Sequence, residues 1–310
     1  MALWLREMVE VSPVADEREE QLSLDAYAEA WPHDSFGLPE LQWFKASLLD
    51  HADLLAREDG AVLGSGFAAL FPGLPDRPTV FITVPPAHRR GGAGTALYAA
   101  LSDWARERGL ELMVAVVADD DPESLAFAEA RGFVEERREK GVTLDLATVA
   151  APAVEPPDGV EIVTWAERPE LEHGIYEVSV EASPDVPGFA DEEHEPFEAW
   201  LEHDMSGPSD RPEATFVAVA GEEVIGYAKL SLSTARPTHA YHDLTAVKRA
   251  WRGRGVARAL KTAQIGWAKA NGFEQLRTQN DESNEPIRRL NAEFGYAPAI
   301  GRIFLRGPLA

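Results

Sequence analysis

Two glycine-rich turns carry the clearest chemical signal in the sequence. They span residues 89–94, RRGGAG, and residues 252–257, RGRGVA, and each follows a predicted strand and begins a predicted helix. Backbone N–H groups at a helix N-terminus bind a pyrophosphate, small residues let the backbone approach it, and arginine adds charge-assisted contacts. A glycine-capped turn of purely structural role is the alternative for one such motif. Two in the same order favour phosphate binding.

Neither turn has the features of a nucleotide-binding loop. The Lys-Ser/Thr ending of a P-loop is missing from both turns. The Gly-x-Gly-x-x-Gly spacing of a dinucleotide fold, with its later ribose-binding acid, is missing as well. The sequence therefore disfavours nucleotide hydrolysis and hydride transfer.

Polar side chains gather on the predicted strand before the second turn. Asp243, Tyr241 and His239 are our candidates for proton transfer to or from a substrate. Since strand residues two apart face alike, they should share a face with Val247, with His242 on the other face unless a bulge intervenes. The alternative is structural, with Asp243 capping a backbone group or pairing with an arginine and the histidines as polar loop residues.

The strand before the first turn lacks such groups. Its corresponding face holds Pro78, Val80, Ile82 and Val84, and none of these side chains exchanges a proton. We therefore expect the first half of the chain to be non-catalytic and the second half to carry the chemistry.

The elements that position these residues recur in the same order in both halves, which indicates an internal duplication. Each half is predicted to have a strand pair, a third strand, the turn, an amphipathic helix, a strand, a short helix and an aromatic-ended turn. In the first half, strands are expected at 54–57, 61–70, 80–84 and 112–117 and helices at 95–107 and 122–130. In the second half, strands are expected at 215–220, 223–232, 241–247 and 276–278. The turn at 252–257 is expected to open a helix that runs to 270, and a second helix is expected at 285–293.

A stretch rich in proline and alanine separates the halves. Residues 149–159 have neither helical nor strand periodicity and are expected to form a linker. The predicted domains are therefore residues 1–148 and residues 160–310.

The turns and the valines before them resemble the GNAT acetyltransferases. The signature of that family is (Gln/Arg)-x-x-Gly-x-(Gly/Ala) after a strand that ends in valine, and Val84 and Val247 have the expected offset. The resemblance covers both halves and implies an α/β fold of mixed α+β character: two tandem GNAT domains, each a mixed, mostly antiparallel central sheet flanked by helices. The tandem arrangement is similar to that of mycothiol synthases.

The resemblance implies acetyl-CoA, or another acyl-CoA, as co-substrate. Backbone amides of the turn would hold the CoA pyrophosphate, and the backbone of the valine would polarise the acyl carbonyl. Asparagines near the last helix would contact the acceptor or the pantetheine, whose amides need donors and acceptors. The implied cofactor-binding residues are Val84, Arg89, Arg90, Gly92 and Gly94 in the first half and Val247, Arg252, Gly253, Arg254, Gly255, Val256, Ala257, Asn284 and Asn291 in the second. For Asn284, capping of the following helix is an alternative.

The resemblance also bears on catalysis. Asp243 and Tyr241 lie where histone and arylalkylamine acetyltransferases carry their catalytic bases. The tyrosine that often protonates the leaving thiolate in this family is missing, because Ala128 and Asn291 occupy its two expected positions. Water is the expected substitute, since an alkyl thiol with a pKa of about 8.5 to 10 leaves with little help.

Composition limits the partners. The formal net charge of -24 disfavours nucleic acid, which is bound through Lys and Arg, and the chain has no cysteine for disulfides, thiolate metal sites or a thiol nucleophile. We see no convincing metal-ligand spacing. The sequence shows no membrane span or signal peptide, so we expect a cytoplasmic protein, monomeric or homodimeric.

Three functions are compatible with these features. The leading hypothesis is an N-acetyltransferase that moves an acetyl group from acetyl-CoA to a primary amine of a small molecule by direct attack in a ternary complex. The second is a non-catalytic acyl-CoA-binding or regulatory protein, which the missing tyrosine favours. The third is an aminoacyl-tRNA-dependent transferase, which the acidity of the chain disfavours.

Overall fold

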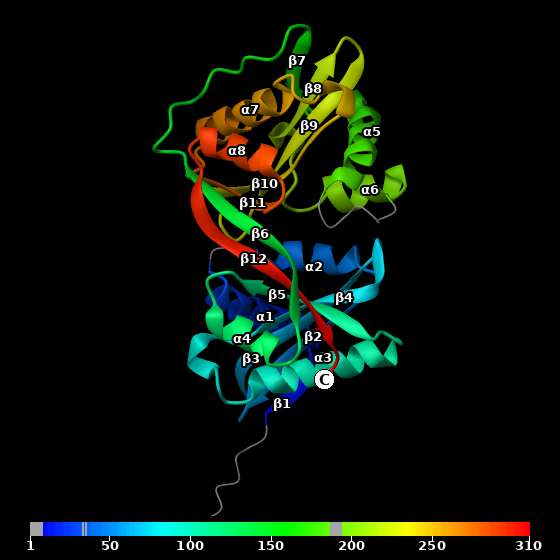
Figure 1. Ribbon diagram of the computed structural model, residues 1–310, viewed down its shortest axis with the longest axis vertical. Helices are drawn as coiled ribbons and strands as arrows, with labels where there is room; N and C mark the ends of the chain where they lie inside the picture. The colour runs from blue at the N-terminus through cyan, green and yellow to red at the C-terminus, as the bar shows by residue number, and fades with distance from the viewer. Residues whose placement is uncertain (1–8, 33, 35, 187–193) are drawn as a thin grey trace, which may run out of the picture. The chain divides into compact units, whose positions relative to one another are not determined.

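The computed structural model describes residues 9–32, 34, 36–186 and 194–310. The chain forms two compact units (Figure 1). Unit 1 contains the described residues up to Arg138 together with Arg302–Ala310, and unit 2 contains Glu139–Gly301. Both are mixed α/β structures with a mostly antiparallel sheet flanked by helices, which confirms the predicted fold class.

Unit 1 begins with strand β1 and ends with the second part of β12. Asp16 caps the first helix, because its side chain accepts a hydrogen bond from the N–H of Glu19 at 3.0 Å. The elements are β1 (Glu10–Pro13), α1 (Glu17–Ala30), α2 (Leu38–Ala46), β2 (Asp50–Glu58), β3 (Ala61–Phe71), β4 (Leu74–Thr83), η1 (Pro86–His88), α3 (Ala93–Glu107), β5 (Leu112–Ala118), α4 (Pro122–Glu129) and the first part of β6 (Val134–Asp145).

Unit 2 repeats this order of elements. They are β7 (Val160–Thr164), η2 (Pro169–Leu171), α5 (Glu172–Ala182), η3 (Ser183–Asp185), α6 (Phe197–Met205), η4 (Pro212–Ala214), β8 (Thr215–Ala220), β9 (Glu223–Leu232), β10 (His239–Val247), η5 (Arg249–Trp251), α7 (Val256–Ala270), β11 (Gln275–Asp281), α8 (Glu285–Glu293) and the first part of β12 (Ala297–Pro308). The predicted linker residues 149–159 lie between β6 and β7, in a stretch of the described chain without helix or strand.

The duplication holds residue by residue from Val84 to α4 and from Val247 to α8. The helix after each turn begins at Ala93 in unit 1 and at Val256 in unit 2, which are 163 residues apart. The same spacing separates β5 from β11, the beginning of α4 from that of α8, and β6 from β12. Positions in the two units can therefore be compared directly.

The two halves of the chain exchange their last strands. Residues 302–308 of β12 pair antiparallel with β5, so the end of the chain completes the sheet of unit 1. Residues 139–145 of β6 pair antiparallel with β11 and complete the sheet of unit 2. The compact units therefore differ from the predicted domains, which divide the chain at the linker. Residues from 139 to the linker belong to unit 2, and residues 302–310 belong to unit 1. The expected order of elements did not indicate the exchange, because it assigns each strand to its own half.

Each sheet is covered by helices on both faces. In unit 2, Val217 and Val219 of β8 pack with α5 and α6, whereas Phe216 and Ala218 pack with α7. This alternation is the two-residue period of a strand buried on both faces. In unit 1, Leu97, Leu101 and Ala105 recur every four residues on α3 and are fully buried.

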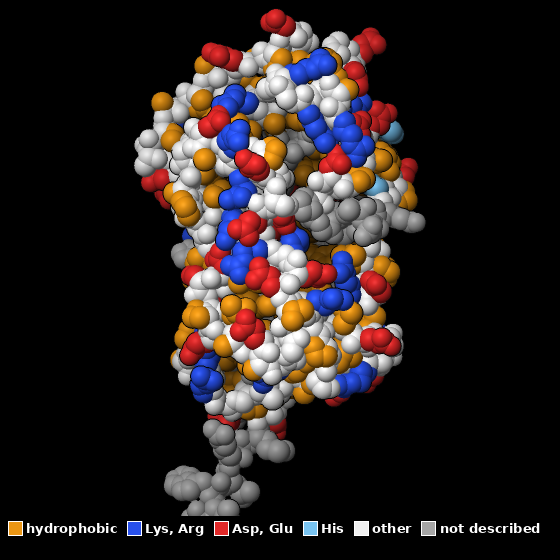
Figure 2. Space-filling model, viewed as in Figure 1, with side chains coloured by type: hydrophobic (Ala, Val, Ile, Leu, Met, Phe, Trp, Pro, Cys, Tyr) orange, Lys and Arg blue, Asp and Glu red, His pale blue; other side chains and the backbone are white. Residues whose placement is uncertain are grey.

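Charged side chains, which give the protein its net negative charge, lie on the surface. Acidic and basic side chains are intermingled on the face drawn in Figure 2. None of the helices in the described ranges is long and apolar enough to cross a membrane.

Candidate functional site

The two glycine-rich turns have the same backbone conformation. In unit 2 the residues in the left-handed region are Gly253, with a φ of 72°, and Gly255, with a φ of 91°. In unit 1 they are Arg90, with a φ of 65°, and Gly92, with a φ of 103°. Each turn leads directly into a 15-residue helix, whose first N–H groups have no partner within the helix. The chain thus presents two helix N-termini of the kind that accept a pyrophosphate.

The strands on either side of each turn diverge. In unit 2, β10 and β11 are parallel and their register runs only from His239↔Gln275 to Tyr241↔Arg277, although β10 continues to Val247. In unit 1, the parallel register of β4 and β5 covers only Thr79↔Val114 and Val80↔Ala115. Beyond these pairs the parallel register ends in both units, although in unit 2 Thr278 Oγ1 still donates to the carbonyl of His242 at 3.2 Å. We call the ends of β10 and β11 beyond this register the splay of unit 2.

The backbone N–H of Val247 faces this splay. The next N–H, that of Lys248, donates to the carbonyl of Ile225 at 2.9 Å, on the β9 side. Because successive N–H groups of a strand point to opposite edges, the N–H of Val247 points toward β11. It can donate to a carbonyl held between the diverging strands, which is the role that the resemblance implies for Val247.

The first arginine of each turn holds the strand end in place. Arg252 Nε donates to the carbonyl of Val247 at 2.9 Å, and Arg89 Nε donates to the carbonyl of Val84 at 3.2 Å. Both guanidinium groups also bind carboxylates of the protein. Their contribution to an anion site therefore includes shaping the turn, in addition to the predicted direct contact.

The carboxylates differ between the units. In unit 2, Asp185 Oδ2 lies 2.7 Å from Arg252 Nη1, and both Asp185 oxygens accept from Arg249 at 2.9 Å. These arginines lower the pKa of Asp185 to about 2. Asp185 approaches from η3, so the splay itself is not bridged by this contact.

In unit 1 the contact does cross the gap between the strands. Arg89 binds Asp121 at 2.7 and 3.2 Å and Glu123 at 3.2 Å, and both acids lie at the start of α4, after β5. Beside it, the ring of Phe127 lies 3.4 Å from where a side chain on Gly94 would begin. The end of β4 is thus tied to α4, and the opening has protein side chains across it.

Buried amides lie at the end of β11 beyond its register with β10. Asn291 of α8, 1% exposed, donates through Nδ2 to Asn280 Oδ1 at 2.7 Å, while its own Oδ1 is buried without a partner. Gln279 Oε1, on β11, is also buried and unpaired. The equivalent positions in unit 1 are Ala128 and Val116. Because pantetheine is a chain of amides, two orphaned acceptors at this end of β11 suit its N–H groups.

The remaining asparagine begins α8. Asn284 is the N-cap residue, yet its side chain makes no capping hydrogen bond. Its equivalent in unit 1, Asp121, does cap α4 through the N–H of Ser124 at 3.0 Å. The amide of Asn284 is therefore not occupied in capping. Of the amides described here, sequence reasoning missed Gln279, because glutamine on a strand has no motif.

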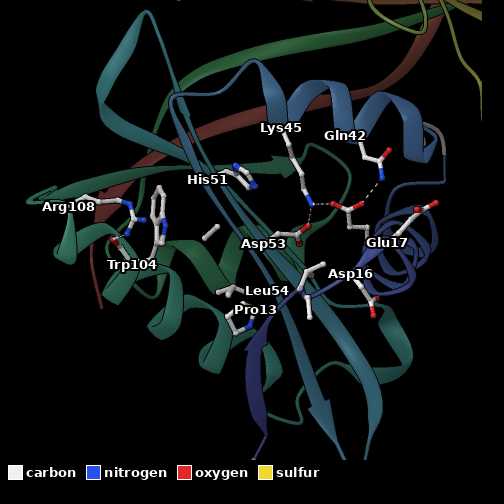
Figure 3. A pocket seen from close by; sticks show the side chains of 14 residues that line it. Pro13, Asp16, Glu17, Gln42, Lys45, His51, Asp53, Leu54, Trp104 and Arg108 are labelled. Carbon is white, nitrogen blue, oxygen red and sulfur yellow. Dashed lines mark hydrogen bonds and ion pairs between the residues drawn. The ribbon is translucent and has the colours of Figure 1, made fainter.

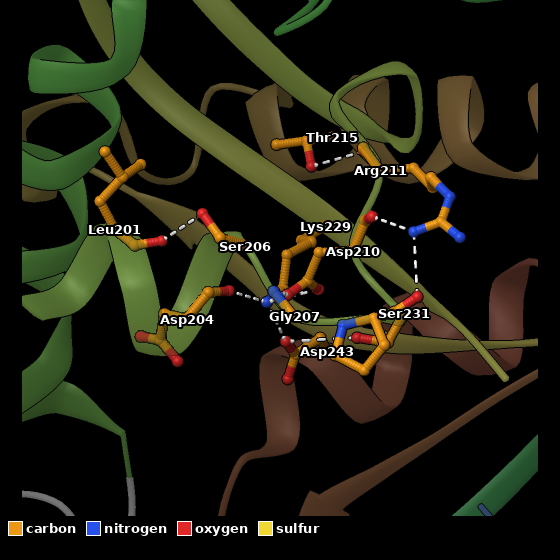
Figure 4. Close-up of polar contacts among 11 residues, drawn as sticks. Leu201, Asp204, Ser206, Gly207, Asp210, Arg211, Thr215, Lys229, Ser231 and Asp243 are labelled. Atoms are coloured by element: carbon orange, nitrogen blue, oxygen red, sulfur yellow. Dashed lines mark hydrogen bonds and ion pairs between the residues drawn. The ribbon is translucent and has the colours of Figure 1, made fainter. Parts of the chain in front are cut away.

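Asp243 forms an ion pair rather than standing alone. Lys229 of β9 lies 2.8 Å from Asp243 Oδ2 and 3.1 Å from Asp210 Oδ1, and it also donates to the carbonyl of Asp204 (Figure 4). Lys229 is 5% exposed, whereas the side chain of Asp243 is 42% exposed. Burial raises the pKa of Asp210, and the neighbouring Lys229 opposes this shift. Asp243 thus presents an accessible carboxylate whose negative charge is partly balanced from within the sheet.

A bulge changes which residues face Asp243. The register of β10 with β9 shifts between His242 and Thr245. Before it, His242 faces α7, where its ring contacts Gln264, and Asp243 lies on the opposite face with Lys229. After it, Val247 packs with α7. The expectation that Val247 and Asp243 share a face is therefore wrong, because the extra residue of the bulge reverses the alternation.

The other two predicted proton-transfer residues lie close by in the chain. Tyr241 precedes the bulge, and burial raises its pKa. His239 begins β10, where its ring contacts Thr238 at 3.1 Å and Arg236 at 3.2 Å. Partial burial and Arg236 lower the pKa of His239. Of the three candidates, Asp243 is the one that pairs with Lys229.

Unit 1 has a separate cavity of about 530 Å³ (Figure 3). Its lining includes Lys45, whose Nζ lies 2.8 Å from Glu20 and 2.5 Å from Asp53. Burial raises the pKa of Asp53, and Lys45 opposes this shift. None of the turn residues 89–94 lines the cavity. The cavity is not part of the glycine-turn site.

Comparison with known proteins shows the same family in both halves of the chain. The family model described as "Acetyltransferase (GNAT) family" matches residues 17–133 and 173–296. Among curated protein sequences, none matches the chain. The described residues contain no group of three or more His, Cys, Asp or Glu side chains suited to a metal ion.

Solved structures share the fold over nearly the whole chain. A tandem GNAT protein from the clavulanic acid biosynthesis pathway is 23% identical, with 98% of this chain and 99% of that chain covered and a TM-score of 0.79. A GCN5-related N-acetyltransferase from Sphaerobacter thermophilus is 21% identical, with 99% and 97% covered and a TM-score of 0.77. A GNAT-family acetyltransferase from Colwellia psychrerythraea is 12% identical, with 97% and 100% covered and a TM-score of 0.63.

Proposed function

Since the chain belongs to the acetyltransferase (GNAT) family, we propose that it is an N-acyltransferase whose unit 2 moves an acetyl group from acetyl-CoA to a primary amine of a small molecule. Unit 1 has the same fold but serves as a non-catalytic partner in this proposal. We keep the expected cytoplasmic location and the division of the sequence at residues 149–159 as parts of it.

One observation carries the assignment to unit 2. Gln279 lies on the end of β11 beyond its register with β10, and Asn291 contacts Asn280 of the same end. Each has an orphaned side-chain oxygen, at positions where unit 1 has valine and alanine, respectively. Buried polar atoms without partners are rare in proteins and call for a ligand or water. In unit 1, Arg89 is bound to Asp121 and Glu123 across the equivalent opening. The residues of unit 2 therefore fit acyl-CoA better than those of unit 1.

The arrangement suggests a division of chemical roles. The N-terminal N–H groups of α7 would hold the pyrophosphate, and Asn291 and Gln279 would accept from the pantetheine amides. The N–H of Val247 would polarise the acyl carbonyl. Asp243 would take a proton from the acceptor ammonium, directly or through water, so that the amine nitrogen attacks the acyl carbon and the C–S bond breaks. The released thiolate takes its proton from water.

A binding experiment with matched variants tests this assignment. Ala257→Glu places a carboxylate in the first turn of α7, and Gly94→Glu does the same at the equivalent position of α3. Both positions have helical backbone, so neither substitution requires a left-handed residue. We expect isothermal titration to show one acetyl-CoA per chain for the wild type and for Gly94→Glu, and at least tenfold weaker binding for Ala257→Glu, because the added charge repels the pyrophosphate.

The other outcomes are equally informative. If acetyl-CoA does not bind the wild type, the acyltransferase proposal is wrong. If Gly94→Glu abolishes binding and Ala257→Glu does not, the active unit is unit 1. Turnover is then measured by the release of free CoA thiol across a panel of primary amines. The assay has no thiol background from the protein, since the chain contains no cysteine.

A second function is favoured by two features of the site. Asp243 is paired with Lys229, and the family's usual tyrosine position holds Asn291, so a non-catalytic acyl-CoA-binding protein would look similar. Asp243→Asn separates the two functions. For an enzyme we expect turnover to fall by about 10²-fold or more, the usual scale of a lost general base, with acetyl-CoA affinity unchanged. A wild type that binds acetyl-CoA but acylates none of the amines supports the binding function.

A further inference from the structure

Unit 2 buries a group of polar side chains between α7 and the sheet. The polar cluster consists of His242 from β10, Lys261 and Gln264 from α7, and Tyr296 from the segment after α8. They are 2%, 1%, 0% and 7% exposed, respectively. His242 Nδ1 lies 3.0 Å from Gln264 Oε1, His242 Nε2 contacts the hydroxyl of Tyr296, and Lys261 Nζ lies 5.7 Å from the centre of the Tyr296 ring.

The polar cluster has more hydrogen-bond donors than acceptors to receive them. A neutral His242 that accepts from the Tyr296 hydroxyl at Nε2 donates from Nδ1 to Gln264. Gln264 Nε2 is then buried without a partner. Among the described residues, no carboxylate lies within 4.0 Å of Lys261 Nζ. The titratable groups that face it are His242 from β10 and Tyr296 from the segment after α8, with the neutral Gln264 on its own helix.

Burial makes protonation of Lys261 and His242 less favourable than in water. Burial lowers the pKa of Lys261 to about 7. Burial, and next the charge of Lys261, lower the pKa of His242 well below its usual value. Lys261 therefore changes its charge in the physiological range, at a place where no acid compensates it.

The fold itself does not require this cluster. The equivalent positions in unit 1 are Val80, Tyr98, Leu101 and Phe133, and all four belong to the buried core. The same elements thus pack in unit 1 without a histidine, lysine or glutamine. Since burying such groups costs stability, their presence in unit 2 alone points to a functional role.

The cluster lies where β10 separates from β11. Tyr241 is the last residue of β10 in register with β11, and His242 follows it at the start of the bulge. The carbonyl of His242 accepts from Thr278 Oγ1 of β11 at 3.2 Å. The ring and the carbonyl of His242 therefore hold the strand at the start of the splay, one residue before Asp243.

We propose that Lys261 and Tyr296 act through His242 as positioning residues, which hold β10 in the geometry for acyl transfer only while Lys261 is neutral. An ammonium at Lys261 puts positive charge beside His242 and attracts the ring of Tyr296, which weakens the Tyr296–His242 contact. Asp243 and Val247 then lose their placement relative to the splay. This inference rests on the proposed acyltransferase function of unit 2.

The test is the pH dependence of kcat at saturating acetyl-CoA and amine. In the wild type, kcat should rise about tenfold between pH 6 and pH 8, as one proton leaves a group with a pKa of about 7. Lys261→Met should reduce this ratio to below about twofold, with the KM for acetyl-CoA unchanged. Lys269→Met is the control, because it removes an amine from the same helix outside the cluster and should keep the tenfold rise.

The outcomes separate this inference from the function on which it rests. A wild type without acyl transfer overturns the proposed function. An active wild type whose tenfold rise survives in Lys261→Met overturns the inference. If Lys261→Met does not fold, amide hydrogen exchange of residues 239–243 in the wild type decides. After correction for the intrinsic rates, protection should be lower at pH 6 than at pH 8, and equal protection at the two values overturns the inference.

Discussion

At the scale of single residues, the site depends on how charges and amides are paired. Sequence reasoning selected Asp243 from its position before the turn, but the partner that balances it, Lys229, lies on the neighbouring strand. Asn291 was selected from resemblance, whereas Gln279 and Lys261 were not selected at all. Their importance comes from missing partners, and a missing partner is visible only when all neighbours are known.

Lys261 also allows a prediction about stability. Its pKa is about 7 in the folded protein and 10.5 in its unperturbed state. Between these values the unfolded chain holds a proton that the folded chain has lost, so the free energy of unfolding rises with pH across this interval and is flat below it. Lys261→Met should therefore stabilise unit 2 at pH 7 by up to about 5 kcal/mol. Urea denaturation at pH 7 and pH 10 would measure this gain, which should shrink at the higher pH.

The same substitution distinguishes stability from function. A variant that is more stable yet has lost the pH dependence of kcat would show that the buried amine is kept at a cost to the fold. A variant that is less stable at pH 7 would mean that Lys261 has a compensating partner in solution.

At the scale of elements, the order of strands and helices could be predicted well. The strands at 112–117 and 223–232 and the helix at 285–293 lie within one residue of the observed bounds. The helix after the first turn begins two residues before its predicted start, and the helix after the second turn ends at Ala270 as predicted. Their hydrophobic periods and their glycine and proline boundaries are local signals. The bulge in β10 has no such signal, because it depends on how β10 pairs with β9, and it reversed the predicted face of Val247.

The start of α4 gives a test at this scale. Asp121 caps α4 through Ser124 and binds Arg89, while its equivalent, Asn284, makes no side-chain cap. Asp121→Ala should lower the free energy of unfolding by about 1 to 2 kcal/mol, since it removes both a cap and an ion pair. Asn284→Ala should change it by less than about 0.5 kcal/mol.

Thermal and urea denaturation of the two variants would compare these positions. The effect of Asp121→Ala should also depend on pH. Despite the opposing effect of burial, Arg89 and the Ser124 bonds keep the pKa of Asp121 below its usual value. The contribution is therefore present near neutral pH and lost as acid protonates the carboxylate. Equal losses for both variants would contradict the difference in capping.

At the scale of the whole molecule, the exchange of strands links the two halves. Residues 139–145 pair with β11, and residues 302–308 pair with β5, so each half of the chain supplies a strand to the other unit. No motif in the sequence predicts this, because β6 and β12 have the same place in each half and would pair equally well within it. The choice depends on contacts between residues far apart in the chain.

A cut in the linker tests the exchange. A protease site inserted within residues 149–159 lies in a stretch of the described chain without helix or strand, so cleavage should leave both sheets intact. We expect the two fragments to elute together in size-exclusion chromatography and to separate only in denaturant. Fragments that separate under native conditions, each still folded, would contradict the exchange.

The registers of the exchanged strands are equivalent. Leu112 opposes Pro308 in unit 1, and Gln275 opposes Asp145 in unit 2, so each register maps onto the other through the same 163-residue offset. A protein made of one half alone could complete its sheet in this way only with a second identical copy, as a reciprocally domain-swapped dimer. The tandem chain has the topology expected if the two protomers of such a dimer became joined by a peptide linker.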